Sequence, residues 1–404
     1  MIQRVEYLNK LKRWKDQEEI KIITGVRRCG KSELLKQYDK WLQKEAKVLP
    51  DNILHIDFEK LEYANFKIKG NLEKFILNWA KDKKVKHYVL LDEIHMMESF
   101  AFFLSSIRHY DFLDIYVTDS NTQTLLGKNA QILGGRYIQI KMYPLSFKEI
   151  MSDTDMKQDE AFKEYMIYGG FPRLTTIDQT MREDYLKQLL DSIIVNDVQA
   201  YAQIRNMNLF LHLVNYLSDN IGRETSNKRI SDYISSNYQE SHSGKTNETI
   251  DEYINALINA NIIKRVNRFD IRGKEEFKML PKYYFVDQGL VNARLGFHNI
   301  KKSYVLENIV FVELLRRECN VWVGKNENEI DFYATHNGKK TYIQVSYTIS
   351  NKDTLKREIK SLIDVKDGNE KIILTLDHPD EAIIDGVKII NLIEWLLDKI
   401  YNDL

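Results

Sequence analysis

Residues 21–32 read KIITGVRRCGKS, a short apolar strand that runs through a glycine-containing turn into the start of a helix. Residues 25–32 match the pattern G-x-x-x-x-G-K-[ST] and stand in the strand-to-helix context that this pattern requires. In such a loop the glycines let backbone N–H groups converge on phosphate oxygens, and the helix N-terminus adds a favourable dipole. The stretch therefore predicts a phosphate-binding loop, with a plain glycine turn as the alternative.

The side chains of this loop suit a magnesium nucleotide, so the expected cofactors are ATP and Mg²⁺. We expect Lys31 to neutralise β- and γ-phosphate oxygens, which also places it among the catalytic residues, and Ser32 to ligate Mg²⁺. For Arg27 and Arg28 a solvated role is the alternative. The residues predicted to bind the nucleotide are Gly25, Val26, Arg27, Arg28, Cys29, Gly30, Lys31, Ser32 and Glu33.

Two acids follow an apolar strand at residues 88–93, YVLLDE. Asp92 is expected to hold Mg²⁺ through water. Glu93 is expected to act as the catalytic base, because an acid beside the metal can accept the proton of the attacking water. An ordinary capped strand is the alternative.

Two weaker catalytic candidates lie further along the chain. The next strand ends in VTDSN at residues 117–121, where Asn121, together with Ser120, is placed to sense the γ-phosphate or the attacking water. A turn whose polar side chains bond their own backbone is an equal alternative. Arg136 is expected to approach the γ-phosphate in its own chain or to serve as an arginine finger on a neighbouring subunit, which would require an oligomer. A plain surface arginine is the alternative.

The chain alternates strands and helices up to about residue 150. Each strand is an almost continuous apolar run, which is typical of a parallel sheet covered on both faces. The expected strands are the one that begins at residue 21, residues 53–58, 87–91 and 115–118, and a fifth within residues 136–145. The fold class is therefore α/β, with a P-loop nucleotide-binding core.

The remainder divides by pattern into three parts. Residues 151–221 show helical periodicity and predict a helical lid. Residues 222–288 predict two helices followed by a hairpin, the outline of a winged helix. Residues 289–404 return to an α/β pattern. The expected organisation is thus residues 1–150, 151–221, 222–288 and 289–404.

Several motifs together give the chain a family resemblance that runs over nearly its whole length. They are GVRRCGKSELL, LLDEIH, VTDSN, YGGFPR, YYFVDQGL, ENIVFVELLRR, EIDFY and YIQVSY. With them the chain resembles a prokaryotic AAA-type ATP-binding protein whose ATPase is fused to a C-terminal domain of unknown function. The resemblance implies ATP binding by the N-terminal third and an ATPase that is cytoplasmic.

The chain departs from the family pattern at two positions. Asp119 stands where relatives usually have glycine, which puts a carboxylate near the expected γ-phosphate and predicts weaker binding or slower hydrolysis through charge repulsion, unless its side chain points away. His95 stands where glutamine is usual, which puts the positioning of the attacking water in doubt.

The C-terminal part resembles the restriction-endonuclease-like fold. The matching positions are Glu307, Asp331 and the triplet Gln344-Val345-Ser346. Asp331 and Gln344 retain groups that ligate metals, but Ser346 stands where the fold's active members have the lysine that activates water. We therefore expect a degenerate module that serves structure or binds a partner protein, and not an active nuclease.

A nucleic-acid-binding or nuclease-like protein is the alternative, with ATP as a regulator and little or no turnover. The second helix of the winged-helix segment, residues 246–260, has three acids and no basic residue, which makes it a poor reader of a major groove. The hairpin at residues 261–282 has seven basic and three acidic residues, a net +4, and suits phosphate contacts. Exposed charges on the solvent face of an ordinary hairpin are the alternative. The basic residues predicted to make them are Lys264, Arg265, Arg268 and Arg272.

Composition adds limits on compartment and partners. Lysine and arginine number 59 and aspartate and glutamate number 59, which excludes a generally basic nucleic-acid coat. Cys29 and Cys319 lie far apart without metal-binding spacing, so a reducing compartment is expected. The longest run without a charged side chain, residues 206–218, is too short for a membrane span. We expect a cytoplasmic ATPase that controls a C-terminal effector module.

Overall fold

The computed structural model describes residues 2–121, 127–199, 202, 204–238, 246–298, 300–378 and 381–399. The chain forms two compact units, which are described separately. The first comprises Met1–Tyr143 with Asn259–Asn261, and the second comprises Pro144–Ile258 with Ile262–Leu404. The finer division into four parts stays a prediction.

The first unit is built on an all-parallel sheet of five strands in the order β2-β3-β4-β1-β5. This confirms the predicted α/β core with a parallel sheet. The strands are β1 (Ile20–Thr24), β2 (Ile53–Asp57), β3 (His87–Asp92), β4 (Leu113–Asp119) and β5 (Tyr137–Lys141). The helices are α1 (Val5–Arg13), α2 (Lys31–Lys44), α3 (Asn71–Trp79), α4 (Phe100–Ile107) and α5 (Gly127–Leu133), with 3₁₀ turns at Pro50–Asn52, Leu61–Lys67 and Ile94–Met96.

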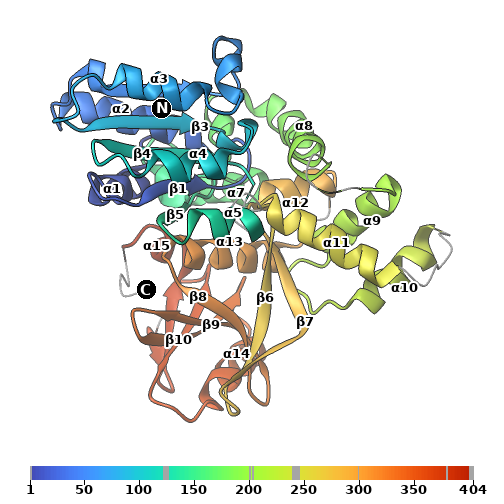
Figure 1. Cartoon of the computed structure of the whole chain (residues 1–404). Coiled ribbons are helices and arrows are strands. Elements are labelled where there is room, and N and C mark those ends of the chain that lie inside the picture. The colour runs from blue at the N-terminus through green and yellow to red at the C-terminus, as the bar shows by residue number, and fades with distance from the viewer. Residues whose placement is uncertain are drawn as a thin grey trace. The chain divides into compact units, whose positions relative to one another are not determined.

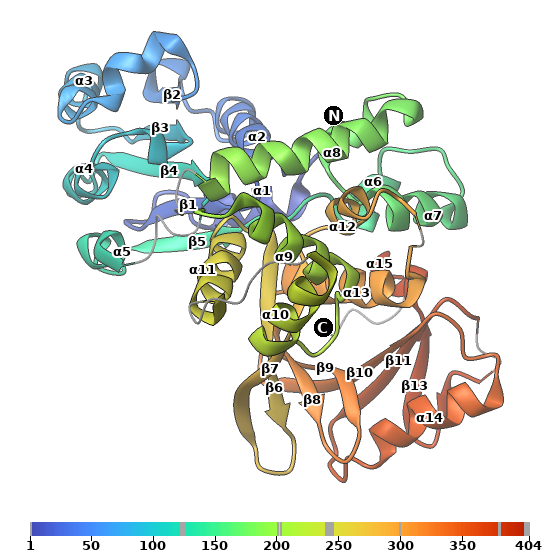
Figure 2. The same cartoon turned by 90° about the vertical axis from the view of Figure 1, so that its right-hand side faces the viewer.

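Helices cover both faces of this sheet, which is why its central strands β1, β3 and β4 are buried along their whole length. Figure 2 shows α3, α4 and α5 along one face and α2 on the other. On the first face, Ile22 and Val117 pack in one core with Leu104 of α4. On the opposite face Tyr116 meets Tyr38 of α2, and their hydroxyl oxygens lie 2.6 Å apart.

The second unit begins with helices, as the periodicity of residues 151–221 predicts. They are α6 (Phe147–Met151), α7 (Gln158–Tyr168), α8 (Arg182–Ile193), a π-helical turn (Ile194–Gln199), α9 (Met207–Asp219), α10 (Asn227–Tyr238) and α11 (Thr246–Asn259), with 3₁₀ turns at Pro172–Thr175 and Gln179–Met181. A capping box begins α6, where Ser146 and Glu149 satisfy each other's backbone N–H groups.

The second unit also contains a mixed sheet of eight strands in the order β12-β13-β11-β10-β9-β8-β6-β7 (Figure 1). Its strands are β6 (Ile263–Asp270), β7 (Glu275–Phe285), β8 (Asn320–Lys325), β9 (Glu329–His336), β10 (Lys339–Ser346), β11 (Glu370–Thr375), β12 (Ile383–Ile384) and β13 (Val387–Asn391). Its helices are α12 (Gln288–Arg294), α13 (Lys302–Arg316), α14 (Lys352–Ile363) and α15 (Leu392–Leu396). The hairpin predicted as a wing, β6 and β7, is therefore continuous with the C-terminal strands, because β6 pairs in parallel with β8.

Helices α13 and α14 lie on opposite faces of this sheet. Phe311 of α13 stacks on Phe332 of β9 with ring centroids 6.0 Å apart, whereas the next residue, Tyr333, packs in a core with Leu362 of α14. Alternate residues of β9 thus face opposite helices, as the period of two along a strand requires. No helix among the described residues is long and apolar enough to cross a membrane.

Candidate nucleotide-binding site

The loop at residues 25–32 joins β1 to α2 and has a backbone that only particular residues permit. Gly30 caps α2 with φ at 108°, and Arg28 also has a positive φ of 64°. A Cβ atom added to Gly25 would lie 2.2 Å from the carbonyl oxygen of Met142. The two glycines therefore let the loop fold tightly against the end of β5, as the glycine pattern predicts.

Lys31 and the two predicted acids converge at the carboxyl end of the sheet. The Nζ atom of Lys31 lies 3.1 Å from the carbonyl oxygen of Gly25 and 3.4 Å from Oε1 of Glu93. Asp92, at the end of β3, accepts hydrogen bonds from the hydroxyl groups of Ser32 and Thr118. The structure thus brings together the side chains that the two separate motifs supply.

The electrostatics of this cluster keep the lysine charged. Burial alone would lower the pKa of Lys31, but the carboxylates around it, with Glu93 contributing most, raise the value to about 12. Burial alone would raise the pKa of Glu93, yet Lys31 and His95 lower it. Burial is the main reason that the pKa of Asp92 is raised, against the effect of its two hydroxyl donors.

Glu93 itself has a left-handed backbone with φ at 55°. For a residue with a side chain this conformation costs about 1–3 kcal/mol and persists only where neighbours hold it. The N–H group of Glu93 donates to Oγ1 of Thr118 at 2.9 Å, which ties it to strand β4. This turn directs a buried carboxylate toward Lys31 at the point where β3 ends.

The tip of β4 lies in the same cluster. Asp119, Ser120 and Asn121 are all buried, and the N–H group of Asn121 donates to Oδ1 of Asp119 at 2.8 Å. The same Oδ1 lies 3.3 Å from Nδ1 of His95, which in turn lies 3.3 Å from Oε2 of Glu93. The two departures from the family pattern are therefore neighbours in space.

Arg136 lies at the opposite edge of the sheet from the loop. It is exposed at the start of β5, and its carbonyl oxygen accepts a hydrogen bond from the N–H group of Ile20, the first residue of β1. The loop begins after Thr24, about 13 Å further along a strand that rises about 3.3 Å per residue. The structure therefore does not bring Arg136 to the loop, and its catalytic role, in its own chain or on a neighbouring subunit, stays a prediction.

Sequence reasoning missed Arg4, which braces the loop from the N-terminal segment. Its guanidinium group is 2% exposed and donates to the carbonyl oxygens of Cys29 at 2.9 Å and Tyr143 at 2.7 Å. Gln37 of α2 holds the same segment, accepting from the N–H group of Arg4 and donating to the carbonyl oxygen of Ile2. An isolated arginine close to the N-terminus carries no motif that would have identified it.

These residues fit a magnesium nucleotide. Lys31 offers a buried ammonium group at the end of a loop in which Gly25 lets the backbone pack closely against the carbonyl oxygen of Met142. Ser32 and Asp92 would hold Mg²⁺, since hydroxyl and carboxylate oxygens are ligands that this cation prefers. When bound, the ion would neutralise charge on the phosphates. Asn121 lies at the strand tip with its main chain tied to Asp119, so a sensing role for it stays a prediction.

The four basic residues of the predicted wing lie on or between β6 and β7. They are Lys264, Arg265, Arg268 and Arg272. Arg268 forms an ion pair with Glu224 at 2.6 Å, and Arg272 forms one with Glu327 at 2.5 Å. Two of the four cations are thus neutralised within the second unit.

The predicted endonuclease-like positions lie on adjoining elements of the second unit. Glu307 is on α13, Asp331 on β9 and Gln344 on β10. Oε1 of Gln344 accepts from the N–H group of Asp331 at 3.1 Å, and Oδ2 of Asp331 accepts from the N–H group of Val345 at 2.8 Å. Each of these two side chains therefore accepts a hydrogen bond from the backbone of the strand that carries the other.

A buried lysine of β7 joins this group. Nζ of Lys282 lies 3.1 Å from Oε1 of Glu307 and 2.9 Å from Oε1 of Glu329, and Tyr284 also donates to Glu307. Burial alone would lower the pKa of Lys282, but Glu307, Asp331 and Glu329 raise it above its ordinary value. Lys282 supplies the positive charge that these carboxylates require, and no motif predicted it.

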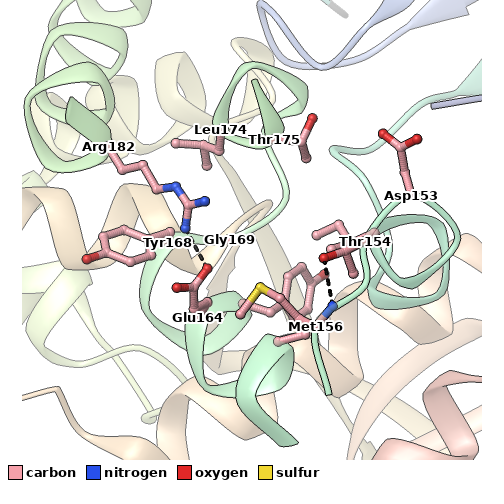
Figure 3. A pocket seen from close by; sticks show the side chains of 12 residues that line it. Asp153, Thr154, Met156, Glu164, Tyr168, Gly169, Leu174, Thr175 and Arg182 are labelled. Atoms are coloured by element: carbon pink, nitrogen blue, oxygen red, sulfur yellow. Dashed lines mark hydrogen bonds and ion pairs between the residues drawn. The ribbon is translucent and has the colours of Figure 1, made fainter. Parts of the chain in front are cut away.

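The second unit also contains a small pocket, drawn in Figure 3, between α7, α8 and the segment after α6. Arg182 and Glu164 face each other across one side of it, with NH1 and Oε2 2.6 Å apart. Tyr168 and Met156 contribute apolar lining. None of the residues that line this pocket belongs to the predicted nucleotide site.

Two family models match the chain. Residues 17–151 match an AAA domain, and residues 159–301 match a domain of unknown function, DUF8612. Together with the five-stranded parallel sheet, the first match identifies an AAA-type P-loop ATPase fold, which implies nucleotide binding. The second agrees with the expected fusion to a domain of unknown function.

Similar proteins match most of the chain. An uncharacterized protein of Methanocaldococcus jannaschii is 29% identical over 85% of this chain and 78% of its own length. Among solved structures, a Walker-type ATPase of Pyrococcus abyssi is 16% identical with a TM-score of 0.45, covering 73% of this chain and 96% of its own. An uncharacterized protein of Haemophilus influenzae is 36% identical over 403 residues, 98% of this chain and 99% of its own. The chain, whose residues 17–151 match an AAA domain, therefore belongs to the family of that Haemophilus protein.

Proposed function

We propose that this protein is a Mg²⁺-dependent ATPase whose nucleotide state controls the C-terminal effector module. The observation that carries the proposal is the meeting of Lys31, Asp92 and Glu93 at one edge of the sheet. A buried cation suits the phosphates, Asp92 with Ser32 suits the metal ion, and Glu93 is the base for the attacking water. The AAA domain match supports the same function at the level of the fold.

Communication with the rest of the chain is proposed to pass through the segment Asn259–Asn261. This segment groups with the first unit, although its first residue ends α11 and β6 follows it in the sequence. Nδ2 of Asn261 donates to the carbonyl oxygen of Ser120 at 3.2 Å, next to Asp119 at the tip of β4. A shift of that tip on hydrolysis would pull directly on the connection between α11 and β6.

Nucleic-acid binding and cleavage are less well supported. The ion pairs of Arg268 and Arg272 use charge that phosphates would otherwise attract. Ser346 donates its hydroxyl to the carbonyl oxygen of Thr348 at 2.9 Å, and no lysine stands at that position to activate water. A gel-shift assay at two salt concentrations tests the alternative, because phosphate contacts would weaken steeply as salt rises.

The experiment that tests the proposal compares Glu93→Gln with wild type. The variant is expected to keep ATP bound and to lose phosphate release by about 10²-fold or more, since the base is removed while the phosphate contacts remain. Glu98→Gln is the matched control, because Glu98 is exposed a few residues further along the same turn. Phosphate release by Glu93→Gln at the wild-type rate would remove Glu93 from the mechanism.

A further inference from the structure

Three side chains that can ligate a metal converge beside the nucleotide site. Oxygen atoms of Glu93 and Asp119 and a ring nitrogen of His95 all lie within 4.8 Å of one another. Nδ1 of His95 is 3.3 Å from Oε2 of Glu93 and 3.3 Å from Oδ1 of Asp119. Among the residues that the structure describes, this is the one such group.

The two separations that involve His95 match those of a coordination sphere. Ligand atoms about 2.0–2.1 Å from a tetrahedral Zn²⁺ ion are separated by roughly 3.3 Å. The two separations at His95 have this value. Three protein ligands leave a fourth position open, as in zinc sites that also bind water or another small ligand.

Burial gives an independent reason to expect a cation. Asp119 is 1% exposed and Glu93 is 8% exposed, and both lie in the core of the first unit. Oδ2 of Asp119 and Oε2 of Glu93 are buried, and neither accepts a hydrogen bond from the described residues. Carboxylate oxygens in this situation require a positive partner or a metal ion.

We propose that Glu93, His95 and Asp119 bind one transition-metal dication of the Zn²⁺ class, separately from the Mg²⁺ of the nucleotide. An imidazole together with two carboxylates favours Zn²⁺ over Mg²⁺, whose preferred ligands are all oxygens. The metal takes Oε2 of Glu93, while Oε1 stays beside Lys31 at 3.4 Å.

The consequence rests on the proposed function, in which Glu93 is the base. A carboxylate that donates its electron pair to Zn²⁺ no longer accepts a proton from water. Zn²⁺ at this site therefore inhibits Mg²⁺-dependent hydrolysis without displacing the nucleotide. Asp119 and His95, which depart from the family pattern, would thus make this chain sensitive to a metal.

The first test is calorimetric titration of the nucleotide-free full chain with ZnCl₂. Wild type is expected to bind one Zn²⁺, and His95→Gln and Asp119→Asn are each expected to bind it at least about tenfold more weakly, since each loses a ligand. His55→Gln is the matched control, because His55 also faces a carboxylate, Asp39, at 3.7 Å and is expected to bind as wild type. Undiminished binding by the His95 and Asp119 variants, or no binding by wild type, would overturn the proposal.

Two further readouts distinguish this site from metal binding elsewhere on the chain. Co²⁺ in place of Zn²⁺ is expected to give visible d–d bands without a thiolate charge-transfer band, whereas a thiolate band would assign the metal to a cysteine and overturn the proposal. Zn²⁺ is expected to slow phosphate release by wild type by roughly 10²-fold, the loss expected when a general base is withdrawn. Equal inhibition of His95→Gln, relative to its own rate without Zn²⁺, would contradict this. If wild type releases no phosphate, the proposed function fails while the titration still decides the metal site.

Discussion

The ammonium group of Lys31 lies 3.4 Å from Oε1 of Glu93, so the phosphate-binding loop and the end of strand β3 share one buried ion pair. The pair holds both groups charged before any nucleotide arrives, since each shifts the pKa of the other toward ionisation. Lys31 also donates to the carbonyl oxygen of Gly25. An incoming phosphate would compete with Glu93 for the lysine, and Glu93 would then be free to act on water.

Arg4 is expected to be needed for a stable loop. Arg4→Met removes two charge-assisted hydrogen bonds and leaves the buried carbonyl oxygens of Cys29 and Tyr143 without this donor. The expected loss is about 2–4 kcal/mol in the free energy of unfolding of the first unit, with weaker nucleotide affinity. Arg13→Met is the control, because Arg13 is exposed on α1. Thermal unfolding and nucleotide titration check this, and wild-type values for Arg4→Met would contradict it.

A buried ion pair between the neighbouring strands β1 and β4 is expected to contribute strongly to the stability of the first unit. Lys21 and Asp114 are fully buried with Nζ and Oδ1 2.6 Å apart, and Tyr116 donates to the other carboxylate oxygen of Asp114. Asp114→Asn is expected to cost about 3–5 kcal/mol, because a buried ammonium group loses its counter-charge. Denaturant unfolding measures this, with exposed Asp111→Asn as control. Equal losses in the two variants would show that the pair is dispensable.

Asp287 is expected to make the second unit less stable as pH rises. Its carboxyl group accepts from the N–H groups of Gly170 at 2.7 Å and Gly289 at 2.8 Å. Burial raises its pKa to about 7, against the lowering effect of these two bonds and of Arg316. The folded state therefore holds a proton that the unfolded chain, with its ordinary value near 3.8, releases.

The sign of this effect is fixed by linkage. The stabilisation is complete below about pH 4 and is lost as pH rises to about 7, at about 1.4 kcal/mol per pH unit. Asp287→Asn lacks the titrating group, so the difference in unfolding free energy between wild type and this variant isolates it. Between pH 4 and 7 the unfolding free energy of wild type should fall relative to that of Asp287→Asn, and above pH 7 the difference between them should stay constant. A difference that stays constant over this range would assign Asp287 an ordinary pKa.

Lys282 is expected to stabilise the eight-stranded sheet by neutralising carboxylates. Lys282→Met leaves Glu307 and Glu329 buried or half-buried without their ammonium partner, at a cost of about 3–5 kcal/mol. Arg272→Met, in the turn of the same hairpin as Lys282, breaks only an exposed pair with Glu327 of the β8–β9 turn and is expected to leave the free energy of unfolding nearly unchanged. Urea unfolding of the two variants is the measurement, and a smaller loss for Lys282→Met than for Arg272→Met would contradict this role.

Local patterns were sufficient to predict the nucleotide-binding core. The glycines of the loop, the position of Lys31 and the acids at the end of β3 all lie in short stretches whose geometry follows from neighbours in the sequence. The strands read as almost continuous apolar runs because both faces are covered, so their parallel arrangement was also predictable. The same patterns predicted the hairpin of β6 and β7.

The rest depended on contacts between residues distant in sequence. The position of Arg136 away from the loop depends on how β5 pairs with β1, which short sequence patterns do not reveal. His95 and Asp119 come close together because β3 and β4 are neighbouring strands of the sheet. Lys282 can neutralise Glu329 because β7 joins the sheet that also contains β9. The pairing of β6 with β8 could not be predicted either, because strands that pair in parallel are not joined by a short turn that the sequence would show.

The central claim is that Lys31 holds the phosphates of ATP, and calorimetric titration of the Lys31→Ala variant with Mg²⁺-ATP tests it most directly. The matched control is Lys36→Ala, because Lys36 is exposed on the same helix. Loss of a charge-assisted contact worth about 1.5–3 kcal/mol predicts affinity weaker by roughly 10- to 100-fold for Lys31→Ala and wild-type affinity for Lys36→Ala. Wild-type affinity in the Lys31→Ala variant would contradict the assignment of this loop as the nucleotide site.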